Sequence, residues 1–356
     1  MPLKGSTSFV VFFLLLIVSA LRSYYVGTDT ANYLFNNIEQ GNFERYLSEP
    51  LSYVLLVFSP NHEFFIFAQS ALVLLPLFLI HRKFENPYLV ITLYYLLGFY
   101  LFSFNISRQM IAAAFVLLGL TYYKEKNWLA YITFMSIAFG FHNSSIVALI
   151  LPICDRYLQL YKRNVYFLLP LTFIVGVIAP TLFFSFFSSF LGNYVEYGTD
   201  EYAGGFSLNR LLLNFFYLFI YNSSSKEGRN SIYMKSMFIS IVLYNLLTFS
   251  GVVNRVAMYF SIADIILLSQ NRYINRNYKK KFMLAVYFYA FSYFSLVLIN
   301  NLGGVVPYEI NPVYFTEKIY NLLCLCIIFL VVLVVLNCVM KKNISKKVQI
   351  GFNKIK

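Results

Sequence analysis

Residues 107–145, "SRQMIAAAFVLLGLTYYKEKNWLAYITFMSIAFGFHNSS", contain two apolar runs that are separated by a short basic turn. Lys124 and Lys126 lie in this turn, whereas Arg108 and His142 lie at the far ends of the two runs. An α-helix of about 20 apolar residues spans the hydrocarbon core of a bilayer, and a slightly shorter helix spans most of that thickness. The stretch therefore predicts a pair of membrane helices, with lysines at one face of the membrane and with Arg108 and His142 at the other.

The composition extends this prediction to the whole protein. Of the 356 residues, 59% are hydrophobic and only 12% are charged, and the mean hydropathy is +0.66. Soluble domains carry about 25% charged residues. The first apolar run, 6–21, continues into Arg22 without a small-residue cleavage site, which favours a retained span over a signal peptide. We therefore expect an all-α polytopic integral membrane protein.

Runs of roughly 17–25 apolar residues predict about twelve transmembrane helices, some of them short or broken. The predicted spans are 6–21, 63–80, 88–104, 109–123, 128–141, 144–160, 165–190, 210–222, 231–250, 256–270, 282–300 and 317–340. The runs 128–141, 210–222 and 256–270 are too short for the bilayer core, so they need tilt, local thinning or burial in the bundle. The segment 51–58, closed by Pro60, predicts an interfacial or re-entrant segment.

The basic residues then assign a side to each loop. Alternate loops hold 22 of the 28 Lys and Arg residues, and the positive-inside rule places these loops and both termini in the cytoplasm. The expected organisation is a single membrane domain over residues 1–340 and a basic cytoplasmic tail over 341–356.

Six basic residues remain for the opposite face, where the insertion rule disfavours them. They are Arg22, Arg45, Arg108, Arg210, Arg255 and Lys318, and His142 joins them there. A single exterior arginine is explained by snorkelling to lipid headgroups. Four arginines (Arg22, Arg108, Arg210 and Arg255) and a histidine at one depth instead favour a shared anionic ligand.

The expected positions of these residues at the starts of helices indicate that the ligand is a phosphate. Arg108, Arg210 and Arg255 are each expected at the start of a helix that runs inward, and Asn143 or Ser144 is the expected N-cap of another. Helix N-termini present free amides and the positive end of the helix dipole, and guanidinium groups bind phosphates through two hydrogen bonds. We therefore predict a pyrophosphate-binding cleft, formed with the exterior loops, at the outer membrane face.

The stretch "GTDTANY", residues 27–33, supplies an acid to the same face. Gly27 permits a turn, and Thr28 and Thr30 place hydroxyls beside the Asp29 carboxylate, which can hydrogen-bond a sugar or hold an arginine. The alternative is an Asx-type turn or a helix cap before the next segment.

No metal, cofactor or nucleic-acid site is predicted. The segment "HEFFI" at His62 lacks the second histidine of the zinc-protease helix, and the three histidines are scattered. There is no Walker loop, no dinucleotide-binding glycine pattern and no acidic pair for a nucleotide sugar. The net charge of +13 forms no basic stripe between polar faces, so nucleic acid is not an expected partner.

Four motifs, in order along the chain, resemble the EpsG/Wzy family of bacterial polysaccharide polymerases. They are "RSYYVGTDTANY" (22–33), "SRQMIAAAFVLLG" (107–119), "FHNSS" (141–145) and "NRVAMYF" (254–260). The chain departs from the family pattern at Ser145, where small apolar residues are common.

The resemblance implies a reaction that suits a pyrophosphate pocket. A Wzy-type polymerase transfers a growing glycan from undecaprenyl pyrophosphate to a hydroxyl of the next lipid-linked repeat unit, at the outer face of the bacterial inner membrane. Asp29 or His142 would be the base. The residues implied for pyrophosphate are Arg22, Arg108, Arg210 and Arg255, and the supporting residues are Thr28, Tyr33, Asn143, Ser144 and Asn254. The implied partners are a chain-length regulator and a flippase of the same pathway.

Two alternatives stay open. A flippase for the same lipid-linked oligosaccharide has a similar number of spans, but its charges line a cavity through both membrane halves, and no two-fold repeat is visible in this sequence. A related O-antigen ligase moves the glycan to another acceptor such as lipid A, and only the order of the motifs favours a polymerase over it.

Overall fold

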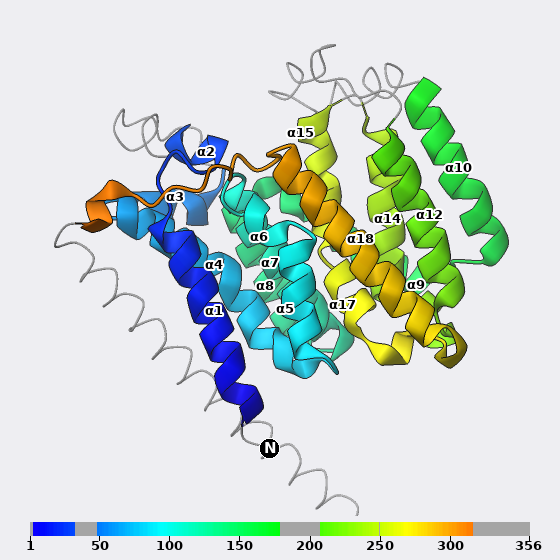
Figure 1. Ribbon diagram of the computed structural model, residues 1–356. Helices are drawn as coiled ribbons and strands as arrows, with labels where there is room; N and C mark the ends of the chain where they lie inside the picture. The colour runs from blue at the N-terminus through cyan, green and yellow to red at the C-terminus, as the bar shows by residue number, and fades with distance from the viewer. Residues whose placement is uncertain (1–2, 33–47, 179–206, 249, 316–356) are drawn as a thin grey trace, which may run out of the picture.

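A computed structural model describes residues 3–32, 48–178, 207–248 and 250–315 (Figure 1). Their regular structure is helical, apart from two isolated β-bridges, which confirms the all-α class. Among these residues, two helices are long and apolar enough to cross a membrane: His62–Lys83 and Arg276–Ile299. The predicted span 317–340 and the predicted tail lie outside the described residues, so the count of twelve spans and the side of the termini stay predictions.

The element bounds are as follows. The longer α-helices are α1 (Leu3–Leu21), α3 (Pro50–Val57), α4 (His62–Ile80), α5 (Pro87–Leu96), α7 (Ser107–Lys124), α8 (Trp128–Phe141), α9 (Leu151–Tyr157), α10 (Lys162–Ile178), α12 (Leu208–Ser223), α14 (Ile232–Leu246), α17 (Asp264–Ser269) and α18 (Lys279–Ile299). The shorter α-helices are α2 (Thr28–Ala31), α6 (Phe99–Phe102), α13 (Lys226–Asn230), α15 (Gly251–Asn254) and α16 (Met258–Ser261). The 3-10 helices are η3 (His81–Lys83), η4 (Asn143–Ile150), η6 (Arg255–Ala257), η7 (Asn271–Tyr273), η8 (Arg276–Tyr278) and η9 (Pro312–Phe315).

Helix α7 packs between α4 and α8 and is buried over most of its length. Its sequence is apolar on every side, and a helix of that kind is stable only when neighbours surround it. The small residues from Ala112 to Ala114 and Gly119 let those neighbours approach closely. A Cβ atom on Gly119 would lie 3.5 Å from the Met135 sulfur of α8. The core therefore fixes α7, and with it the residues of its first turn.

Three of the expected spans are broken in the structure, in agreement with the prediction that some spans are short or broken. The run 88–104 divides into α5 and α6 at Gly98, whose φ of 78° is accessible mainly to glycine. The run 144–160 divides into η4 and α9, and Pro152 lies at the start of α9. The run 256–270 consists of η6, α16 and α17, although no Pro or Gly marks these breaks. Broken helices at membrane depth are tolerated where protein surrounds them.

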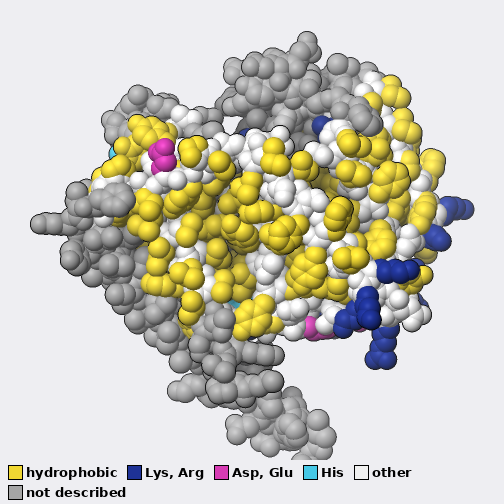
Figure 2. Space-filling view, viewed as in Figure 1, with side chains coloured by type: hydrophobic (Ala, Val, Ile, Leu, Met, Phe, Trp, Pro, Cys, Tyr) yellow, Lys and Arg dark blue, Asp and Glu magenta, His cyan; other side chains and the backbone are white. Residues whose placement is uncertain are grey.

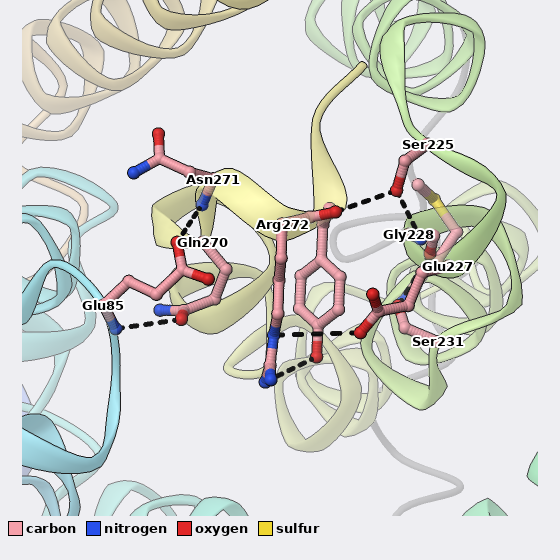
Figure 3. A network of polar contacts seen from close by, with 10 residues as sticks. Glu85, Ser225, Glu227, Gly228, Ser231, Gln270, Asn271 and Arg272 are labelled. Carbon is pink, nitrogen blue, oxygen red and sulfur yellow. Dashed lines mark hydrogen bonds and ion pairs between the residues drawn. The ribbon is translucent and has the colours of Figure 1, made fainter. Parts of the chain in front are cut away.

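Contacts between loops gather the basic turns at one end of the bundle, here named the basic end. Lys83 Nζ lies 2.9 Å from Glu125 Oε1, which joins the turn after α4 to the turn after α7. Glu85 Oε2 accepts a 2.9 Å hydrogen bond from the amide of Asn271, which joins the first turn to the loop before α18 (Figure 3). Lys235 Nζ, at the start of α14, lies 3.5 Å from Asp155 Oδ1 in α9.

The loop after α12 belongs to the same network. The Ser225 hydroxyl donates to the Arg272 carbonyl at 2.9 Å, and Arg272 Nε lies 3.9 Å from Glu227 Oε1 (Figure 3). On the face shown in Figure 2, Lys and Arg side chains gather over this end, where α10 and α18 begin. The loops that the positive-inside rule groups together therefore lie together in space, over the described residues.

The position of the basic end shows in which direction each helix runs. Helices α4, α7, α9 and α12 reach the basic end at their C-termini, whereas α5, α8, α10, α14 and α18 leave it at their N-termini. Arg108 in the first turn of α7 and His142 after the last turn of α8 consequently lie at the opposite end, here named the site end.

Helix α3 lies at the site end (Figure 1), and its boundaries are within one residue of the predicted segment 51–58, whose interfacial or re-entrant position stays a prediction. Its eight residues bury Ser52, whose hydroxyl donates to the Phe141 carbonyl at 2.7 Å. Its outer surface is apolar, because Val54, Val57 and Phe58 are 45%, 46% and 76% exposed. A helix with an apolar outer surface fits contact with lipid rather than with water.

The segment 300–314 runs from the end of α18 back over the end of α1 (Figure 1). Ser23 donates its amide to the Glu309 carbonyl at 2.8 Å, and the Gly27 amide donates to the Gly304 carbonyl at 2.8 Å. The Tyr308 hydroxyl donates to the backbone of α1. These bonds satisfy backbone groups that the end of α1 would otherwise leave unpaired.

Candidate functional site

The turn before α7 is hydrogen-bonded to helix α2 at the site end. The Thr30 hydroxyl of α2 donates to the Phe104 carbonyl at 2.7 Å, and the Asp29 amide donates to Asn105 Oδ1 at 2.9 Å. Gly27 makes this contact possible, since a Cβ atom there would lie 2.0 Å from the Phe104 oxygen and its φ is 92°. The "GTDT" stretch is therefore held against the residues that lead into Arg108.

The central feature of the site is the side chain of Glu49, which is 4% exposed and contacts two of the predicted site residues. Arg108 Nη1 donates to Glu49 Oε2, and the His142 ring bonds through Nδ1 to Glu49 Oε1. The amide of Asn143 approaches Glu49 Oε1 at 3.4 Å. One carboxylate from the start of α3 thus joins the start of α7 to the junction of α8 and η4.

The charges of this cluster explain why the carboxylate is ionised. Burial by itself raises the pKa of Glu49, because it disfavours the charged form. The hydrogen bond to His142, the positive charge of Arg108 and the bond from the Asn143 amide favour the charged form, and together the contacts of Glu49 outweigh burial, so the pKa of Glu49 lies below its ordinary value. Removing one member of a buried pair typically costs about 3–5 kcal/mol, because the other charge is left without compensation.

The junction after α8 differs from the prediction in one respect. His142, and neither Asn143 nor Ser144, is the N-cap residue of η4, and no side chain caps that helix. The extended backbone of His142 (φ −156°, ψ 114°) ends α8 and turns the imidazole toward Glu49. The Ser144 hydroxyl instead lies 2.9 Å from the Tyr259 hydroxyl of α16. The structure therefore brings these residues to the site, but the N-cap prediction was wrong.

Arg255 was predicted to start a helix, but its helical segment begins one turn earlier. The helical segment begins at Gly251, and Arg255 follows α15 as the first residue of η6, so it does not start the helix. The carbonyl of Arg255 accepts a 2.8 Å hydrogen bond from Gln109 Nε2, which ties η6 to the first turn of α7. Asn254 lies beside it, and its Oδ1 atom is buried with no hydrogen-bond partner in the described part of the chain. Arg255 and Arg108 therefore belong to adjoining elements.

The remaining predicted residues divide into two groups. Arg210 lies in the first turn of α12, as predicted, and α12 packs against α10, α14 and α18. Thr28 begins α2 and Asp29 lies in its single turn, with Gly27 as the N-cap. Tyr33 lies outside the described residues, as do Arg45 and Lys318, which were predicted to be exterior.

Arg22 occupies an interior position rather than a surface. Its guanidinium donates to the Ser19 carbonyl at 2.6 Å and to the Ser70 hydroxyl at 3.2 Å, between α1 and α4. Its Cζ atom lies 4.9 Å from the centre of the Phe104 ring. Burial lowers the pKa of Arg22 to about 10, which still leaves it charged at neutral pH. It therefore contributes positive charge beneath the turn that precedes α7, with 1% of its surface exposed.

Glu49 is the residue of this cluster that the sequence did not predict. It lies 59 residues before Arg108 and 93 before His142, so no local pattern connects the three. The available signal was a glutamate directly before Pro50, at the start of an apolar helix on the face that holds the unexplained cations.

The site combines several hydrogen-bond donors with a single carboxylate. Among the described residues no group of three or more His, Cys, Asp or Glu side chains could hold a metal. The cluster instead presents a guanidinium, an imidazole and amide groups around one carboxylate. Guanidinium and amide donors of this kind bind phosphate groups.

An all-helical bundle with apolar helices is compatible with the class of helical membrane proteins. The chain belongs to the EpsG family, whose model matches residues 7–310. Membership identifies a membrane protein of polysaccharide biosynthesis, with a function of the polysaccharide polymerase type. No curated protein and no solved structure matches the chain.

Proposed function

We propose that the protein is a Wzy-type polysaccharide polymerase of the bacterial inner membrane. It transfers a growing glycan from undecaprenyl pyrophosphate to a hydroxyl of the next lipid-linked repeat unit, at the outer face. The observation that carries this proposal is the cluster of Arg108 and His142 at the end of the bundle opposite the basic loops, in a chain of the EpsG family. A chain-length regulator and a flippase of the same pathway are its proposed partners.

The protein has two roles in this reaction: it stabilises the leaving group and it removes a proton from the acceptor hydroxyl. The acceptor oxygen forms a bond to the anomeric carbon while the bond from that carbon to the pyrophosphate oxygen breaks, and the electron pair leaves with the pyrophosphate. Donors aimed at the leaving group stabilise the charge that grows there, which is the role of Arg108 and of the neighbouring Arg255. A base, Asp29 or His142, removes the proton of the acceptor hydroxyl. No nucleotide sugar enters the reaction.

The role of the more distant arginines is electrostatic in this proposal. Arg22 and Arg210 lie in or near the ends of α1 and α12, and they add positive potential to the half of the bundle where the pyrophosphate binds. Ser144, Asn143 and Asn254 place polar groups beside the cluster, where a sugar hydroxyl can bind.

Reconstitution of the purified protein with the lipid-linked repeat unit of its own host tests the proposal. Polymer is expected, and it is expected in the presence of a chelator as well, because the leaving group is already activated as a pyrophosphate. A deletion strain should accumulate single-repeat glycan on its surface. Loss of all surface glycan would point to a flippase or a ligase and would contradict the proposal.

A further inference from the structure

Glu49 lies at the centre of the cluster, and the reaction proposed above assigns it no role. We propose that Glu49 is a positioning residue that makes His142, rather than Asp29, the base of the transfer reaction. The inference rests on the proposed function. It begins from one observation: a single buried carboxylate binds both the imidazole of His142 and the guanidinium of Arg108.

The first step concerns the tautomer of His142. A neutral imidazole carries one N–H group, and its other nitrogen carries a lone pair. Arg108 and the Asn143 amide point donors at Glu49, and the pair with Arg108 holds Glu49 as an ionised acceptor. An ionised carboxylate only accepts hydrogen bonds, so it requires the proton of His142 on Nδ1. The lone pair is then on Nε2, and the His142 side chain is 16% exposed.

The second step concerns charge. When Nε2 takes the proton of the acceptor hydroxyl, the ring becomes an imidazolium beside the Glu49 carboxylate. An opposite charge in contact with a cation stabilises it, and the 4% exposure of Glu49 means that water does little to weaken this attraction. The carboxylate thus acts on the ring as the buried acid of a catalytic triad does, by orienting it and by stabilising its charged form.

The third step explains why the same carboxylate also holds Arg108. The guanidinium has five N–H donors in one plane, and the bond from Nη1 to Glu49 fixes the orientation of that plane. Glu49 therefore sets the geometry of the base and of the leaving-group donor together. The acceptor oxygen gives its proton to Nε2 of His142 and forms its bond to the anomeric carbon, and the electron pair of the broken bond goes to the pyrophosphate that Arg108 binds.

The variant Glu49→Gln separates positioning from structure. Its amide oxygen can still accept from Arg108, but its NH₂ group then faces Nδ1 of His142 and favours the wrong tautomer, with the proton on Nε2. The rate of polymerisation by reconstituted protein should fall by about 10²–10⁴. The matched control is Glu125→Gln, which removes a half-exposed carboxylate at the basic end and should leave the rate unchanged.

The decisive measurement is the double variant. If Glu49 acts through His142, then Glu49→Gln should lower the rate of the His142→Ala protein very little further, and added imidazole should restore part of the rate of His142→Ala. Losses that multiply in the double variant, or a Glu49→Gln protein that no longer elutes as a folded species in detergent, would assign Glu49 a structural role and overturn the inference. Wild-type protein that makes no polymer would instead refute the proposed function itself, and the inference with it.

Discussion

The substitution Arg108→Lys tests whether the cluster binds pyrophosphate or only balances charge. Both side chains are cationic, so lysine can still compensate the buried Glu49 carboxylate, and the protein should stay folded in the membrane. The two side chains differ in shape. A guanidinium has five N–H donors in one plane, and Arg108 donates one of them from Nη1 to Glu49, whereas an ammonium is a compact point charge.

The expected loss follows from that difference. Removing one preorganised donor from a growing negative charge costs about 2.7–4 kcal/mol, or about 10²–10³ in rate. Arg108→Lys should therefore shorten the glycan ladder severely at matched protein levels, and Arg255→Lys should act in the same direction through the adjoining η6 segment. The control is Arg272→Lys, an exposed residue of the basic end whose pair with Glu227 is 3.9 Å long. Full-length ladders from both Arg108→Lys and Arg255→Lys would refute the assignment of these residues to pyrophosphate.

Three further predictions use other features of the structure. Reporter fusions at Arg276, in the basic end, and within residues 191–209 should report opposite sides of the membrane, and the same side for both would contradict the topology. Gly27→Ala should destabilise the protein and reduce polymerisation, because the new Cβ would lie 2.0 Å from the Phe104 oxygen; unchanged melting and activity would show that α2 can move away. The pKa of Glu49 is lowered in the folded state, so its contribution to stability is complete above about pH 4.5 and is lost as the pH falls through the lower, folded-state pKa; the melting temperature of wild type should therefore decline more steeply there than that of Glu49→Gln.

The sequence was sufficient to predict the helical class and the grouping of the loops. Both follow from local quantities: the length of the apolar runs and the position of Lys and Arg residues between them. Lys83 and Glu125, or Glu85 and Asn271, lie together because each pair belongs to turns on the same side. The breaks within 256–270 were not predictable in this way, because that run contains neither proline nor glycine.

The site was predictable only in part, for a related reason. Arg108 and His142 stood out because cations at the outer ends of apolar helices are costly and need an explanation. Their joint partner could not be inferred, since Glu49 comes from a different helix far away in the sequence. The burial of Arg22 could not be predicted either. Its place after an apolar run indicated the membrane surface, and its contacts with Ser19 and Ser70 show that it is buried.

Glu49 is the N-cap residue of helix α3. Val54 and Val57 of this helix and its C-cap residue Phe58 are exposed on the outer surface. The acid at the centre of the site therefore lies on an element whose other surface is exposed and apolar. Thickness or acyl-chain order of the surrounding lipid acts on α3 directly, since hydrophobic mismatch shifts helices relative to the membrane. We therefore expect the rate of the reaction to depend on the lipid: the protein should place its carboxylate differently against Arg108 and His142 in short-chain and in long-chain lipids.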